Sequence, residues 1–278
     1  MGTLGLIVGQ ITSNGAGFIG LARRAFTEDG ATLRHIRVAE IKKVAREFDR
    51  FPKYSTFDAL ANSAGVQFPI ILIASLTAAT EVGYLMLAMR ILQAPMGLIG
   101  SSISQVYFSR AVDEYRADCL DDFTARTIEG LAKIGIGPLM FLGFTAPYIF
   151  GYIFGTEWNR AGEIVAWMTP WFVLQFLVSP VAMSLNVTNN QRKALAVQIG
   201  GLALRVSSVL VAGTVMSGVF AIEAYAISGF IFYFVYFVVV CRVTKVTSTH
   251  IIIAFKGVIP LIFVAVSLAL ILKWLVLT

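Results

Sequence analysis

Apolar stretches long enough to cross a membrane recur along the whole chain. A helix needs about 20 consecutive apolar residues to cross the hydrocarbon core of a bilayer. Only 14% of the residues are charged, against about 25% in soluble domains. The sequence therefore predicts an all-α polytopic membrane protein with about eight transmembrane helices, placed at about 1–22, 55–76, 81–108, 130–150, 162–187, 194–215, 219–240 and 251–277.

The basic residues fall in alternate links between these stretches, while the other links hold only Arg160. Cytoplasmic loops of membrane proteins carry an excess of lysine and arginine. The net charge of +6 is therefore explained by membrane orientation, and we expect no nucleic-acid partner. Four glutamates fall at the opposite helix ends, namely Glu81, Glu157, Glu163 and Glu223. The segments predicted to be cytoplasmic are 23–53, 109–128, 188–193 and 241–250.

The segment 23–53 is the one long polar part of the chain, and it carries nine lysines and arginines. Apolar residues recur within it at roughly helical spacing, namely Ile36, Val38, Ile41, Val44, Ala45 and Phe48. This pattern predicts a basic amphipathic helix that lies on the cytoplasmic surface of the membrane. A solvated linker helix without lipid contact is the alternative.

Motifs of known catalytic, metal and nucleotide sites are absent from the sequence. The two histidines, His35 and His250, lie in polar segments, and no His/Cys/Asp/Glu cluster has the spacing of a metal site. The chain has neither a G-x-x-x-x-G-K-[ST] loop nor a G-x-S-x-G turn. We therefore expect a protein that is not an enzyme and that uses no metal or organic cofactor, with coupling to Na⁺ or H⁺ left open.

Two arginines, Arg90 and Arg205, lie near the middle of apolar stretches. Arg90 is about 14 Å from the start of its stretch at 1.5 Å per helical residue. A charge at such a depth is costly and is typical of a substrate pathway. Because guanidinium binds phosphate through two parallel hydrogen bonds, both arginines are candidates for binding an anionic substrate in a cavity. A purely structural pairing with helix carbonyls or a carboxylate is the alternative for each.

Other polar residues inside the apolar stretches extend this candidate site. Asp58 and Asn62 are four residues apart and share one helical face, and Gln175 is a single polar group in a later stretch. Such side chains face protein or water rather than lipid. They are predicted to line the same cavity as Arg90, with hydrogen bonding between helices as the alternative.

Residues 51–108 resemble a known family of transporters. The chain reads F-P-K-Y-S from Phe51, an Asn-Ser pair at Asn62, and Q-F-P-I-I-L from Gln67. It continues as V-G-Y-L-M-L-A-M-R-I-L-Q-A-P-M-G-L-I-G-S-S-I from Val82. This stretch is similar to the polysaccharide (O-antigen/lipopolysaccharide) flippases of the multidrug/oligosaccharidyl-lipid/polysaccharide exporter superfamily. The family pattern G-x-Y-x-x-A-x-R-x-x-x-x-P is matched by Gly83, Ala88, Arg90 and Pro95, with Tyr84 beside the glycine.

The resemblance implies a fold of two six-helix bundles around a central cavity, often with two additional helices. It also implies that an undecaprenyl-pyrophosphate-linked oligosaccharide is flipped across the bacterial inner membrane by alternating access, with Arg90 and Arg205 neutralising the pyrophosphate. Membrane lipids and other polysaccharide-assembly proteins are the further partners that it implies. The implied divisions are 1–22 as the last helix of a truncated N-terminal bundle, 23–53 as a cytoplasmic connection, 54–240 as the C-terminal six-helix bundle and 241–278 as an additional helix.

Two other functions are alternatives to flipping. A membrane-embedded polymerase or ligase of the same pathway would need a large outer loop with catalytic residues, whereas the outer links here are short. A drug/cation antiporter of the same superfamily would need acidic residues in its cavity, and only Asp58 and Glu223 are available. The expected function is therefore flipping, by a chain that we expect to be incomplete.

Overall fold

The computed structural model describes residues 38–47 and 51–277, except 217 and 219, together with seven isolated positions before residue 28. It forms two units, Met1–Pro52 and Lys53–Thr278. The helix of the first unit whose bounds the structure describes is α3 (Val38–Glu47), which lies within the basic segment. The membrane-surface position of α3 stays a prediction. The predicted span 1–22 lies almost wholly outside the described residues.

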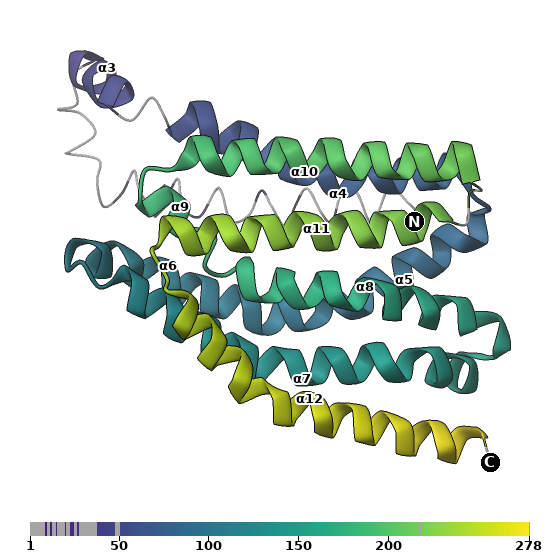
Figure 1. Ribbon diagram of the computed structural model, residues 1–278. Helices are drawn as coiled ribbons and strands as arrows, with labels where there is room; N and C mark the ends of the chain where they lie inside the picture. Colours follow the sequence, from purple (N-terminus) through teal and green to yellow (C-terminus); the bar gives the residue numbers. More distant parts are fainter. Residues whose placement is uncertain are drawn as a thin grey trace. The chain divides into compact units, whose positions relative to one another are not determined.

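The second unit is built from helices that run back and forth along one direction (Figure 1). Seven of its described helical segments are long and apolar enough to cross a membrane. This confirms the predicted all-α polytopic fold. In chain order the elements are η1 (Phe51–Ser55), α4 (Thr56–Leu76), α5 (Ala79–Pro95), η2 (Met96–Gly100), α6 (Ser101–Arg116), α7 (Leu120–Phe154), η3 (Thr156–Trp158), α8 (Asn159–Val178), α9 (Ser184–Val187), α10 (Gln191–Val211), η4 (Ala212–Met216), α11 (Phe220–Val243) and α12 (Ser248–Leu277).

Several helices extend past the apolar stretches that predict them. The segment 109–128, predicted as a loop, is instead the end of α6, a short turn at 117–119 and the start of α7. Its arginines, among them Arg110 and Arg126, are exposed on these helices. The charged residues show where a helix leaves the apolar layer of the membrane. They do not show where the helix ends, because its backbone hydrogen bonds continue beyond that layer. Conversely, the predicted span 162–187 is interrupted after Val178, because Pro180 has no N–H to continue the helical ladder.

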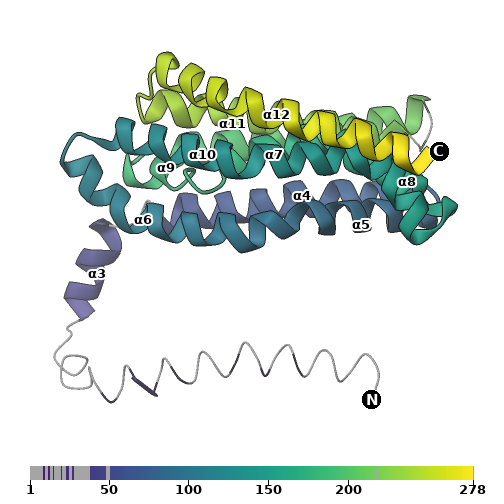
Figure 2. The same ribbon diagram turned by 90° about the horizontal axis from the view of Figure 1, so that it is seen from below.

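The helices pack in two groups. α4 packs mainly on α10, and α10 packs on α11, whereas α5 packs mainly on α8, α8 on α7, and α12 on α7 (Figures 1 and 2). The contact between α8 and α11 joins the two groups, and its core includes the fully buried rings of Trp171, Phe172 and Tyr225. α7 and α8 approach closely at Gly162, where an added Cβ would lie 2.3 Å from the carbonyl oxygen of Ala146. Although α4 and α5 are consecutive in the chain, they therefore pack against different helices, α4 against α10 and α5 against α8.

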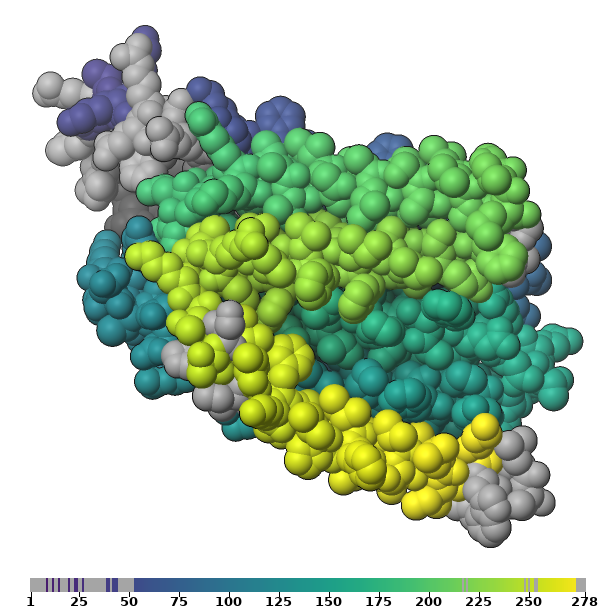
Figure 3. Space-filling model, viewed as in Figure 1, coloured from purple at the N-terminus to yellow at the C-terminus, as the bar shows by residue number. Residues whose placement is uncertain are grey.

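Large apolar side chains cover the outside of the second unit. Figure 3 shows one face of it, formed in part by α10, α11 and α12. A surface of this kind is stable against lipid rather than water, so the chain is a multi-pass membrane protein. The exposed apolar residues on these three helices include Ile199, Leu210, Val211, Ile227, Phe230, Phe234, Ile259, Phe263 and Leu268.

Three helices stop at the same end of the second unit with the same type of turn. The amides of Cys119, Asn190 and Val246 donate to carbonyls five residues earlier, at 2.9, 2.7 and 2.9 Å. This bond defines the Schellman motif, which usually places glycine in the left-handed position. Here that position is taken by Asp118, Asn189 and Lys245, with φ of 58°, 57° and 59°. We name this end, where α6, α9 and α11 stop, the basic end, and the opposite end the acidic end.

Replacing Lys245 by glycine is expected to stabilise the protein by about 1 kcal/mol, because an L-residue in the left-handed region is strained by about that amount. Thermal unfolding of the purified protein in detergent would measure the change. Lys256→Gly inside α12 is the matched control, and it should destabilise by about 1 kcal/mol. A lower unfolding temperature for Lys245→Gly would show that the lysine side chain contributes more than its backbone strain costs.

Candidate functional site

An open groove of about 470 Å³ lies between α4 and α5. It forms because α4 packs on α10 while α5 packs on α8, so that the two helices separate. Three of its lining residues are polar or charged, Gln67, Arg90 and Gln93, and the others are apolar. We call this the α4–α5 groove, lined by Val66, Gln67 and Ile70 from α4 and by Met86, Leu87, Met89, Arg90 and Gln93 from α5.

Arg90 is the charged residue of the α4–α5 groove. Its side chain is exposed, and within the described part of the chain it has no hydrogen bond, ion pair or ring contact. Gln67 and Gln93, on the facing and the same helix, add amide donors and acceptors nearby. A guanidinium with free donors, in a groove that is otherwise apolar, is suited to a ligand with an anionic group and an apolar part. The structure thus places Arg90 at an open groove, while its role in binding stays a prediction.

Arg205 lies elsewhere, fully buried among α4, α10 and α11. Its Nε donates to the carbonyl oxygen of Gly201 at 3.1 Å, and its guanidinium carbon lies 4.2 Å from the centre of the Phe232 ring. Neither terminal nitrogen makes a hydrogen bond of good geometry, although the hydroxyls of Tyr225 and Tyr233 interact with the guanidinium. No carboxylate among the described residues forms an ion pair with Arg205. Arg205 is not part of the lining of the α4–α5 groove.

The other three candidate residues are also dispersed. Asp58 is half-buried near the start of α4, and its Oδ1 is enclosed without a hydrogen-bond partner. Asn62 is exposed one turn later, and Gln175 is half-buried on α8. None of them lines the α4–α5 groove. Of the five residues that the sequence singles out, Arg90 alone lines the α4–α5 groove.

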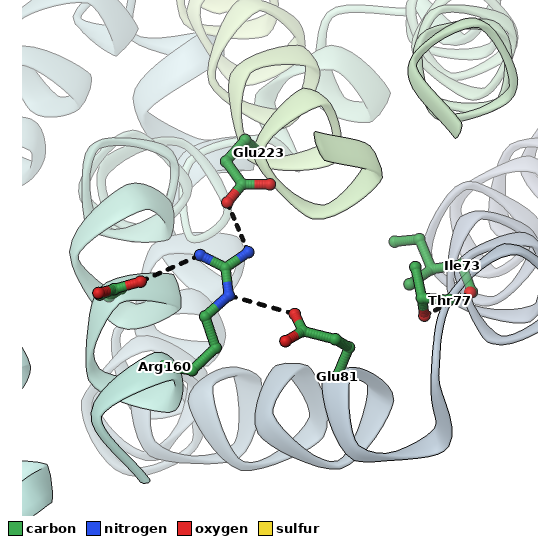
Figure 4. A network of polar contacts seen from close by, with 6 residues as sticks. Ile73, Thr77, Glu81, Arg160 and Glu223 are labelled. Atoms are coloured by element: carbon green, nitrogen blue, oxygen red, sulfur yellow. Dashed lines mark hydrogen bonds and ion pairs between the residues drawn. The ribbon is translucent and has the colours of Figure 1, made fainter. Parts of the chain in front are cut away.

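A cluster of four charged residues near the acidic end was not predicted as a unit. Figure 4 shows Arg160 of α8 between Glu81 of α5 and Glu223 of α11. Its Nε lies 3.2 Å from Glu81 Oε2, and its two terminal nitrogens lie 3.1 Å from Glu163 Oε2 and 2.6 Å from Glu223 Oε1. We call these residues the Arg160 cluster. The sequence did hold the signal, since Arg160 is the one basic residue in the links at this end and glutamates surround it.

The Arg160 cluster adds ion pairs between α8 and both α5 and α11 at the acidic end. The side chains of Arg160, Glu81 and Glu223 are only 20%, 17% and 13% exposed, whereas Glu163 is 55% exposed. Removing one partner of an ion pair that is shielded from water strongly destabilises a protein, because the other charge stays buried without compensation. The cluster therefore fixes the start of α5, and with it the helix that carries Arg90, against α8 and α11.

Comparison with known proteins gives a family match and a structural match. A family model described as "Polysaccharide biosynthesis protein" matches residues 4–163, which include both helices of the α4–α5 groove. The solved structure "Lipid II flippase MurJ, inward closed conformation" has a TM-score of 0.54 and 12% identity, and the match covers 87% of this chain and 55% of that one. The chain thus spans about half the length of that flippase and shares its fold. No curated protein matches.

Removal of the central guanidinium from the Arg160 cluster, as in Arg160→Gln, is expected to destabilise the protein by about 2–3 kcal/mol, because two largely buried carboxylates lose their partner. Unfolding in detergent would measure this loss. The control is Lys133→Gln, which breaks the exposed Lys133–Glu129 pair (2.7 Å) and should cost less than about 0.5 kcal/mol. Equal losses for the two variants would mean that the cluster does not hold the helices together.

Proposed function

Because the chain belongs to the polysaccharide biosynthesis protein family, we propose that it acts in flipping a lipid-linked oligosaccharide across the bacterial cytoplasmic membrane for surface polysaccharide assembly. The flippase fold that it shares with a lipid II flippase supports translocation rather than catalysis. The observation that carries the proposal is the placement of Arg90, with free hydrogen-bond donors, in the α4–α5 groove.

The chemistry of the groove fits a ligand that joins a phosphate group to a long apolar chain. Arg90 supplies a positive charge and a planar set of donors that bind phosphate in a bidentate manner. Met86, Leu87 and Met89 supply an apolar lining beside it. An undecaprenyl-pyrophosphate-linked oligosaccharide combines these features, and Gln67 and Gln93 offer hydrogen bonds to its polar part. Methionine side chains are flexible and adapt to ligands of irregular shape.

Alternating access is the mechanism that we propose for this movement. The α4–α5 groove is open, and its two helices have few contacts with each other. The Arg160 cluster, in contrast, holds α5 to α8 and α11 at the acidic end. A groove between weakly joined helices can change its width while the rest of the bundle stays packed. We assign the basic end to the cytoplasm, in keeping with the positive charges of its turns.

Arg90→Gln is expected to reduce flipping at least tenfold, because the neutral amide cannot replace a charge-assisted bidentate contact with phosphate. The measurement is the amount of surface polysaccharide in a bacterium that lacks its own O-antigen flippase and expresses this chain. Arg90→Lys should retain part of the activity, since it keeps the charge but loses the planar donors.

The matched control is Arg126→Gln, which removes an exposed arginine near the basic end of α7 and should leave transport unchanged. Membrane levels of every variant are compared by immunoblot. Full transport by Arg90→Gln at normal protein level would refute the role of Arg90. Absence of transport by the unsubstituted chain would contradict the proposed function itself.

A further inference from the structure

Two lysines from different helices lie at one level near the basic end of the second unit. Lys133 belongs to α7 and Lys256 to α12, and both side chains are exposed. Cε of Lys133 lies 3.6 Å from the position that a Cβ on Gly257 would take, and Lys256 is the residue before Gly257. The stem of Lys133 thus reaches across to α12, one residue from Lys256. We call these two residues the lysine pair.

The contact that holds the lysine pair is the one that attaches α12 to the rest of the unit. α12 packs mainly on α7. Four residues further along both helices, a Cβ on Gly137 of α7 would lie 3.7 Å from the Cβ of Leu261 of α12. Near the acidic end, Nζ of Lys273 lies 4.8 Å from the centre of the Tyr148 ring. The two helices therefore run in parallel, and the lysine pair lies at the basic end of their contact.

The lysine pair also lies where α12 enters the apolar layer of the membrane. The apolar span of α12 runs from Phe255 to Lys273, so Lys256 is its second residue. A lysine at such a position keeps its stem in apolar surroundings and extends its ammonium toward the lipid headgroups. Because Lys133 meets α12 at the next residue, it lies at a similar depth. Both ammonium groups can therefore reach the level of the lipid phosphates.

Protein groups compensate the charge of the lysine pair only in part. Nζ of Lys133 lies 2.7 Å from Oε1 of Glu129, and their side chains are 53% and 35% exposed, so this ion pair is weak. α12 contains no acidic residue. Lys256 forms no hydrogen bond or ion pair with another residue that the structure describes. Two cations thus share one carboxylate, and one further negative charge would balance them.

Exposed apolar side chains continue from the lysine pair toward the middle of the membrane. Ile259 and Phe263 follow Lys256 at spacings of three and four residues, which places all three on one face of α12. Ile259 is 57% and Phe263 is 74% exposed. A ligand that contacts both the lysines and this face joins an anionic headgroup to a long apolar chain. A free phosphate ion would contact the lysines alone.

We propose that the lysine pair binds the phosphate of an anionic phospholipid from the leaflet at the basic end, with one acyl chain along Ile259 and Phe263. Basic sites between transmembrane helices recognise anionic headgroups in this way. The bound lipid bridges α7 and α12, so it strengthens the attachment of α12 to the unit. This inference does not depend on the proposed function, because the α4–α5 groove takes no part in it.

The test is thermal unfolding of the purified full chain in detergent micelles that contain phosphatidylcholine and increasing amounts of phosphatidylglycerol. A lipid that binds the folded state raises the unfolding temperature as its concentration rises, which gives an apparent affinity. The double variant Lys133→Gln/Lys256→Gln should bind phosphatidylglycerol about thirtyfold more weakly, and Lys256→Gln alone about fivefold, at about 1 kcal/mol per lysine. Lys256→Arg should keep most of the affinity, because it keeps the charge.

Lys193→Gln is the matched control, because it removes an exposed lysine from the first turn of α10, which also lies at the basic end. Its affinity for phosphatidylglycerol should equal that of the unsubstituted chain. An equal loss for Lys193→Gln and the double variant would show a general attraction to positive charge and overturn the inference. Unchanged affinity of the double variant would overturn it as well.

Two further measurements separate the lipid site from other roles of these lysines. Inorganic phosphate should not raise the unfolding temperature, because it cannot contact Ile259 and Phe263. Stabilisation by phosphate that the double variant loses would assign the site to a free anion and refute the lipid. In phosphatidylcholine alone, Lys256→Gln should unfold at the same temperature as the unsubstituted chain. A marked drop there would make Lys256 structural and refute its role in lipid binding.

Discussion

A charged side chain inside an apolar helix must find a partner, water or a ligand, and three arginines of this chain meet that requirement in different ways. Arg160 is surrounded by three carboxylates. Arg90 remains exposed in the α4–α5 groove. Arg205 is enclosed by an aromatic ring, a backbone carbonyl and the bare backbone of Gly65. The first arrangement ties three helices together, whereas in the other two the terminal nitrogens make no hydrogen bond of good geometry within the described residues.

The position of the groove follows from how the helices are shared between two groups. α4 and α5 are joined by a short turn, yet each packs on a different neighbour. At the acidic end the Arg160 cluster ties α5 to both α8 and α11. Because of this division, α4 faces two different surroundings. It lines the groove on one side and covers the buried Arg205 on another.

Hydropathy and charge were sufficient to predict the helical membrane fold, because the length and composition of each span are local properties of the sequence. They did not predict the helix ends at Arg116 and Leu120, since a helix continues beyond the apolar layer. The exposure of Arg90 and the burial of Arg205 depend on how each helix is rotated against its neighbours. Both arginines lie at similar depth in their spans, so the sequence could not tell them apart. The Arg160 cluster joins residues far apart in the chain, which only packing brings together.

The two ends of the second unit differ in the sign of their excess charge, and this difference affects how the protein responds to a membrane potential. At the acidic end Arg160 is outnumbered by its carboxylates, and Lys273 lies over the ring of Tyr148. At the basic end several lysines and arginines remain exposed on the helices and turns. The bundle therefore carries a permanent dipole along its helix axes. In a membrane whose potential is negative on the side of the basic end, each elementary charge contributes about 2.3 kcal/mol per 100 mV, so the field itself favours keeping the protein in that orientation.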